Sequence, residues 1–178
     1  MASSDEADPR RGFLKVVVAA ASATIGFVAA LPALALLSHP LRRKTITGGD
    51  EPIRVRPTPS ELPPGMPVRV ELVADRQDGW ARLEKVKVGA AWLVRSAGGQ
   101  IRAFSTVCPH LGCGIDWDAR AEKFACPCHQ STFALDGACL NGPSPRDLDE
   151  LDVVTTASEI RVRYQRFRPA SKLKEPIG

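Results

Sequence analysis

The sequence lacks a strong excess of either charge. Residues 52–178 carry 18 basic and 15 acidic side chains, and no basic stripe is interleaved with aromatic residues. A nucleic-acid-binding surface usually shows both features, so we predict no nucleic-acid partner. Internal repeats and low-complexity runs are also absent. With 178 residues, the chain has room for one domain of ordinary size and a smaller segment.

Histidine and cysteine are scarce, and most of them lie in one short window. Two of the three histidines and four of the five cysteines lie within residues 108–131. The window reads CPHLGC, then twelve residues, then CPCHQS. This concentration of soft ligands predicts a metal site, a disulfide framework or both. Two thiolates and two imidazoles can also hold tetrahedral zinc, so structural zinc is an alternative.

The two halves of the window resemble the Rieske iron–sulfur proteins. Each half has one cysteine followed closely by a histidine, and one further cysteine. In that family two cysteines hold one iron of a [2Fe–2S] cluster and two histidines hold the other. The resemblance covers roughly residues 66–168 and implies four ligands, with the two histidines as the reactive pair: Cys108, His110, Cys126 and His129.

The resemblance also implies roles for residues beside the ligands. It pairs Cys113 with Cys128 in a disulfide between the two cluster loops. Ser131 occupies the position whose hydroxyl donates to a bridging sulfide, which raises the reduction potential. Phe133 stands where many respiratory relatives have a tyrosine, so a lower potential is expected. Gln130 replaces the usual glycine, which leaves the backbone conformation there open.

Three further features surround the predicted cluster. Gly142 and Pro143 begin a segment resembling the proline loop that covers the cluster from a third side. Leu111 follows a predicted ligand and is expected either to contact quinone by apolar packing or to be an ordinary surface leucine. Cys139 belongs to neither half of the motif, and we predict a small buried hydrophobic residue there.

Histidine ligation sets the redox range of such a cluster. Two ferric ions, two sulfides, two thiolates and two neutral imidazoles carry no net charge, whereas four thiolates would leave the cluster two units more negative. The reduction potential of a cluster with two histidine ligands therefore lies at roughly −150 to +300 mV, whereas plant-type ferredoxins with four cysteine ligands lie at about −400 mV. Oxidation of the metal makes the remaining ring N–H more acidic, which links electron transfer to proton transfer. Quinol gives up both and is the predicted donor.

Residues 16–37 form an uncharged run of 22 residues rich in alanine, valine and leucine. A helix of this length spans about 33 Å, enough to cross a bilayer core of about 30 Å. A buried core helix is the alternative, but the run has no polar stripe. We therefore predict a transmembrane anchor.

Residues 1–15, predicted to be cytoplasmic, end in RRGFLK, which resembles a twin-arginine export signal. Such a signal implies a single-pass protein of the bacterial inner membrane with its globular domain on the periplasmic side. Residues 33–35 resemble a cleavage site, but the apolar run continues through Leu37, which favours a retained anchor. Residues 42–44 are basic and would lie on the periplasmic side in this orientation, whereas basic residues are usually enriched on the cytoplasmic side of a membrane span.

The rest of the chain predicts a mainly β protein. Residues 38–65, with Gly48-Gly49 and several prolines, are expected to form a flexible tether and connecting loop. Residues 66–168 predict a small antiparallel β-sandwich or barrel with a cluster-binding subdomain inserted at 106–145, followed by a tail at 169–178. Expected strands are 68–73, 80–88, 90–96, 100–105, 151–156 and 159–166, with hairpin turns at 98–99 and 157–158.

Three functions are compatible with this site. The first is the Rieske subunit of a quinol-oxidising cytochrome bc complex with b-type and c-type cytochrome partners. The second is a subunit of another exported oxidoreductase such as arsenite oxidase. The third, a soluble ferredoxin or oxygenase domain, is disfavoured by the anchor and by the cysteine pair expected to form a disulfide. The anchor and tether favour the first.

Overall fold

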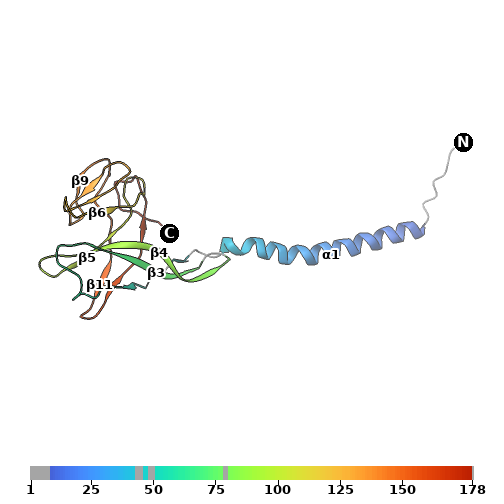
Figure 1. Ribbon diagram of the computed structural model, residues 1–178. Helices are drawn as coiled ribbons and strands as arrows, with labels where there is room; N and C mark the ends of the chain where they lie inside the picture. The colour runs from blue at the N-terminus through green and yellow to red at the C-terminus, as the bar shows by residue number, and fades with distance from the viewer. Residues whose placement is uncertain (1–8, 43–45, 48–50, 78–79, 178) are drawn as a thin grey trace. The chain divides into compact units, whose positions relative to one another are not determined.

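Among the residues that the structure describes, one long helix comes first in the sequence and strands follow it (Figure 1). The computed structural model describes residues 9–42, 46–47, 51–77 and 80–177. The chain divides into two units, residues 1–44 and residues 45–178, and we call the second unit the head. The mainly β fold predicted from the sequence is confirmed.

Helix α1 (Pro9–Arg42) contains the uncharged run predicted as an anchor. Its apolar side chains are exposed, and its most apolar 18-residue window has a mean hydropathy of 2.1. By length and composition α1 is a candidate membrane span. The helix extends beyond residues 16–37 at both ends and takes in the RRGFLK segment, whose role as an export signal stays a prediction.

The head contains a large antiparallel sheet and a smaller one. The large sheet has the strand order β1 (Ile46–Thr47), β3 (Val68–Gln77), β4 (Arg82–Arg95), β5 (Ile101–Ser105) and β10 (Glu150–Leu151). The smaller sheet has the order β11 (Val153–Thr155), β12 (Ile160–Val162) and β2 (Ile53–Val55). We call these two sheets the base of the head.

Strand β4 is buried on both faces over residues 90–94, where successive side chains point to opposite sides. Ala91 and Leu93 pack into the core between the two base sheets, whereas Trp92 and Val94 pack into a second core on the other side. Figure 1 shows β11 on one side of this sheet and strands β6 and β9 on the other. β4 therefore joins the base to the part of the head that carries the predicted ligands.

The cluster subdomain contains four very short antiparallel strands. They follow the order β6 (Asp116–Asp118), β7 (Lys123–Ala125), β8 (Thr132–Phe133) and β9 (Cys139–Asn141). Phe124 and Phe133 fill its core, and the Trp92 indole donates a 3.0 Å hydrogen bond to the Ile115 carbonyl. The base thus fixes the start of the subdomain by both packing and a buried polar contact.

Several strand predictions need correction. The strands expected at 80–88 and 90–96 are one strand, in which Gly89 pairs with Leu72 of β3. Position 89 requires glycine because a Cβ there would come within 2.3 Å of the Tyr164 ring. The strand expected at 151–156 is divided at Asp152 between two sheets, and that at 159–166 ends at Val162. Both hairpin turns are confirmed by the hydrogen-bonded pairing of β4 with β5 and of β11 with β12.

The predicted boundaries of the head were also too narrow. Part of the expected tether belongs to the head, since β2 pairs with β12 and Leu62 is buried in the base core. Arg95 holds this segment by donating to the carbonyls of Pro59 and Leu62. Gly48-Gly49 lies outside the described residues. At the other end, the expected tail forms a hairpin of β13 (Arg166–Phe167) with β14 (Pro176–Ile177).

Candidate metal centre

The first cluster loop, residues 108–113, closes on itself through two backbone hydrogen bonds. The Cys108 amide donates to the Cys113 carbonyl at 2.7 Å, and the Gly112 amide donates to the Cys108 carbonyl at 2.9 Å. Gly112 has φ +82°, in the left-handed region that glycine adopts without strain. The loop therefore turns sharply enough to bring both of its ends together.

The second cluster loop, residues 126–131, has the same two hydrogen bonds at equivalent positions. The Cys126 amide donates to the Ser131 carbonyl at 2.8 Å, and the Gln130 amide donates to the Cys126 carbonyl at 3.1 Å. Gln130 has φ +60° and occupies the position equivalent to Gly112 in the first loop. The backbone at Gln130, where the family usually has glycine, is therefore left-handed. Glutamine adopts the conformation that the turn requires at some cost in strain.

The two predicted cysteine ligands lie on the inner side of the loops. Cys108 is 0% exposed and Cys126 is 2% exposed, and the two thiols are neighbours. Burial, together with the neighbouring Cys126 thiol, raises the pKa of the Cys108 thiol to about 11. Such a thiol is hard to ionise on its own, and it loses its proton when it binds a metal, because the metal supplies the missing positive charge.

The two predicted histidine ligands lie on the outer side. Their ring centroids are 4.8 Å apart and the ring planes are nearly perpendicular, at 88°. His129 is exposed and His110 is partly exposed. The arrangement is asymmetric, with buried sulfur on one side and accessible nitrogen on the other. Such a site can hold two metal ions of different ligation and present imidazoles to a partner molecule.

Two polar atoms among the described residues are buried without a hydrogen-bond partner: His110 Nδ1 and Ser131 Oγ. Ser131 is fully buried. A native protein rarely leaves such atoms unpaired, since each costs about 1–3 kcal/mol. An iron bound to Nδ1 and a sulfide accepting from the hydroxyl would satisfy both. The residues present therefore fit a [2Fe–2S] cluster.

The disulfide implied by the resemblance is confirmed. Cys113 and Cys128 are bonded across the two loops, with their Cα atoms 6.6 Å apart. Their sulfurs and that of Cys126 lie within 4.8 Å of one another, a grouping that resembles a three-cysteine metal site. Because two of the three sulfurs are bonded to each other, only Cys126 of this group is available as a thiolate ligand.

The proline loop lies against the second cluster loop. Gly142 has φ +100°, and a Cβ at this position would come within 2.4 Å of the Ser131 Cα. Only glycine permits this approach, so the loop that begins with Gly142 and the exposed Pro143 covers the backbone of Ser131.

Three other residues identified from the sequence are now placed. Leu111 is 58% exposed beside His110, and Phe133 is fully buried in the subdomain core. Cys139 is only partly buried, which corrects the prediction of a buried residue. It lies on β9, at the edge of the four-stranded sheet, where one side remains open. Its backbone amide donates to Asp147.

Buried thiols opposite accessible imidazoles, between two loops joined by a disulfide, define an iron–sulfur electron-transfer protein with mixed ligands. The Rieske [2Fe-2S] domain family matches residues 55–155, more than half of the chain. The chain therefore belongs to this family and is a Rieske [2Fe–2S] protein.

Many known proteins are similar to this chain, and three of them illustrate the range. The cytochrome b6-f complex iron-sulfur subunit of Chlorobaculum tepidum is 28% identical over 144 residues, which cover 81% of this chain and 69% of the relative. The same subunit of Prochlorococcus marinus strain AS9601 is 38% identical over 68 residues, 37% of this chain and 38% of the relative. The cyanobacterial plasma membrane Rieske protein from Synechocystis PCC 6803 is 36% identical, with 43% of this chain and 78% of that chain covered and a TM-score of 0.39.

The matched stretch spans well under two thirds of the Prochlorococcus subunit. The match to the family over residues 55–155 shows the Rieske fold and its [2Fe–2S] cofactor.

Proposed function

We propose that this chain is the Rieske subunit of a membrane quinol-oxidising complex of the cytochrome bc type. In this role it takes one electron, coupled to a proton, from quinol and passes the electron to a c-type haem. The pairing of buried thiols with accessible imidazoles carries the proposal, because it offers a quinol a proton acceptor next to the electron acceptor. The bound cluster supplies the one-electron redox chemistry.

The ligands would be Cys108 and Cys126 for one iron and His110 and His129 for the other. The buried thiols keep one side of the site dry, whereas the outer ring nitrogens of the histidines can accept a hydrogen bond from quinol. One of these nitrogens then takes a proton and later releases it to solvent. Leu111, exposed beside His110, would pack against the quinone ring.

The second electron and second proton of quinol need separate acceptors. We assign the electron to a low-potential b-type haem in a partner subunit, since quinol gives up two electrons and a [2Fe–2S] cluster accepts one, and the second proton passes to solvent water. Helix α1 would remain as the anchor in the bilayer, with the head on the periplasmic side of a bacterial inner membrane. The relatives named as cytochrome b6-f subunits support this assembly.

Electron paramagnetic resonance of the reduced membrane fraction tests the proposal. We expect a Rieske spectrum that changes shape when a quinone-site inhibitor is added, and a b-type haem that co-purifies with the chain. A Rieske spectrum that ignores the inhibitor, together with purification without b-type haem, would contradict the proposal. Purification with a molybdenum-containing subunit would instead indicate an oxidoreductase of the arsenite oxidase kind.

Exchange of one imidazole tests the proton-coupling step. His129→Cys replaces a neutral ligand with an anionic one, so the reduction potential should fall and its pH dependence near neutrality should disappear. Redox titration between pH 6 and pH 9 measures both effects. Retention of the full pH dependence in His129→Cys would show that the His129 imidazole does not carry the proton.

A further inference from the structure

The hairpin at the C-terminus contacts the peptide between two proposed ligands. The Ala170 amide donates to the Pro109 carbonyl at 2.8 Å, and Pro109 lies between Cys108 and His110. Pro109 is fully buried and has no backbone N–H, so this carbonyl is its one backbone hydrogen-bonding group. The contact links residues 61 positions apart in the sequence and places the C-terminal segment directly against the first cluster loop.

Ala170 adopts a backbone conformation that costs free energy. Its φ is +57°, a left-handed value that is uncommon for alanine, and its side chain is exposed. Side-chain packing therefore does not explain the conformation. Strain of this kind persists where the surroundings fix it. At Ala170 the strained conformation directs the backbone N–H at the Pro109 carbonyl. The carbonyls of Arg168 and Ser171, on either side of Ala170, also accept hydrogen bonds.

Arg146 holds those two carbonyls. Its guanidinium donates to the Ser171 carbonyl and, at 3.0 Å, to the Arg168 carbonyl, so it grips the segment on both sides of Ala170. The same guanidinium donates to both carboxylate oxygens of Asp149, at 2.9 and 2.8 Å. The two side chains are only 10% and 6% exposed, so the pair is buried and its geometry is well defined.

Asp149 connects the Arg146–Asp149 pair to the base. The Ser105 amide donates to the Asp149 carbonyl at 2.8 Å, and Ser105 ends β5 just before the first cluster loop. Arg146 itself follows the proline loop. One guanidinium thus ties together the proline loop, the end of β5 and the C-terminal hairpin.

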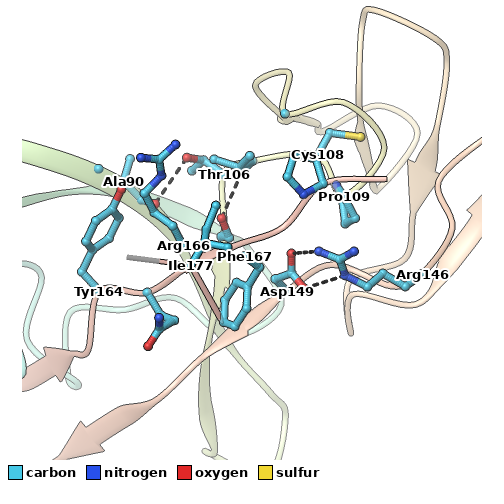
Figure 2. Close-up of a pocket in the computed structure, with 16 residues that line it drawn as sticks. Ala90, Thr106, Cys108, Pro109, Arg146, Asp149, Tyr164, Arg166, Phe167 and Ile177 are labelled. Atoms are coloured by element: carbon cyan, nitrogen blue, oxygen red, sulfur yellow. Dashed lines mark hydrogen bonds and ion pairs between the residues drawn. The ribbon is translucent and has the colours of Figure 1, made fainter. Parts of the chain in front are cut away.

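A cavity of about 210 Å³ lies beside these contacts (Figure 2). Its lining includes Cys108 and Pro109 from the cluster loop, Arg146 and Asp149, and Phe167 from the hairpin. Figure 2 shows the Arg146 guanidinium facing the Asp149 carboxylate. Because this space is not filled by side chains, polar contacts rather than close packing hold the loop on this side.

We propose that Arg146 is a positioning residue for the iron–sulfur cluster, which acts by clamping the C-terminal hairpin against the ligand loop at Pro109. The proposal rests on the assignment of Cys108 and His110 as ligands. The His110 and Leu111 amides donate to the Cys108 sulfur. Hydrogen bonds to a ligand sulfur favour the reduced cluster. If the clamp is released, the loop shifts, these bonds lengthen, and the reduction potential falls.

Four variants of the full-length chain test the clamp. Arg146→Gln removes the charge and the forked geometry, whereas Arg146→Lys keeps the charge. Lys172→Gln is the matched control, since Lys172 lies on the same hairpin with an exposed side chain. A chain that ends at Pro169 removes the Ala170 donor and leaves the Arg146–Asp149 pair intact, and it decides the matter if Arg146→Gln does not fold.

Two readouts separate positioning from general stability: the midpoint potential and the rate of cluster loss in the presence of a chelator. We expect Arg146→Gln and the shortened chain to lose the cluster roughly tenfold faster and to show a lower potential. Arg146→Lys should recover part of both, and Lys172→Gln should match the original chain. An unchanged potential in both altered chains, with or without faster cluster loss, would overturn the proposal. Absence of iron from the original chain would instead overturn the ligand assignment.

Discussion

The head has two halves that are stabilised in different ways. Among the described residues, the buried core of the base contains only valine, leucine, isoleucine and alanine, and the two longest strands of its large sheet, β3 and β4, have 10 and 14 residues. The core of the cluster subdomain contains one tryptophan, three phenylalanines and two cysteines, and its strands have two or three residues each. The base can be held by strand pairing and burial alone. The subdomain has too few ladder hydrogen bonds for that.

The subdomain compensates with contacts of other kinds. Phe124 lies at the centre of an aromatic group, with ring centroids 4.9 Å from Trp117 and 5.7 Å from Trp92. The disulfide links the two loops, and the cluster itself would bind atoms from both. We therefore expect changes at the ligands to unfold or loosen the subdomain while the base stays folded. The predictions below test this division, in order of decreasing effect.

Cys126→Ser should remove the cluster completely. A serine oxygen is a poor ligand for an iron that needs two thiolates, and His110 Nδ1 and Ser131 Oγ would again lack partners. Iron analysis should find none, and near-ultraviolet circular dichroism should show disordered aromatic groups while the far-ultraviolet β signal persists. Cys139→Ser is the matched control, because that half-buried cysteine lies outside both loops. Loss of the far-ultraviolet signal would mean that the halves do not fold separately.

Replacement of both Cys113 and Cys128 by serine should destabilise the subdomain by about 3 kcal/mol, the cost expected for a loop of 15 residues. The cluster should still assemble, but it should be lost faster on warming. Urea unfolding followed by tryptophan fluorescence, which reports on Trp92 and Trp117, measures the difference. A change below 1 kcal/mol would show that the ligands and aromatic core hold the loops without help.

The two cluster loops allow a paired test at their equivalent left-handed positions. Gly112→Ala should cost about 1–2 kcal/mol from backbone strain alone, since a Cβ there meets no atom within 4 Å. Gln130→Gly should instead add up to about 1 kcal/mol of stability, because it removes the same strain at a small entropic cost. The urea midpoints of the two variants should move in opposite directions. Movement in the same direction would refute the equivalence of the loops.

Phe133→Tyr should change the potential more than the stability. Phe133 is fully buried in the subdomain core. The resemblance to respiratory Rieske proteins implies that a tyrosine hydroxyl at this position would donate to a ligand cysteine. A donor to sulfur raises the reduction potential. Protein-film voltammetry should record the rise, with little change in the urea midpoint. An unchanged potential combined with a loss of about 1–3 kcal/mol would indicate a hydroxyl buried without a partner.

The sequence predicted the cluster site better than it predicted the rest of the head. The loops were recognisable because metal ligation demands particular residue types at fixed spacing, and the disulfide between Cys113 and Cys128 was confirmed. The turn at Gly98-Gly99 was equally clear, since its preference is local. Features of this kind depend on residues close in sequence.

The errors arose where distant residues decide the outcome. Strand β4 continues through Gly89, which pairs with Leu72 of β3 and lies against the ring of Tyr164. The C-terminal hairpin forms from two-residue strands that carry little pattern, and Arg146 holds it from 20 or more residues away. Neither contact can be read from local hydrophobic periodicity.

Metal and sulfide analysis of the purified chain, combined with electron paramagnetic resonance after reduction by dithionite, tests the central claim most directly. The account predicts two irons and two acid-labile sulfides per chain and a Rieske-type spectrum with a low average g value. One zinc per chain, with no labile sulfide and no signal, would contradict it.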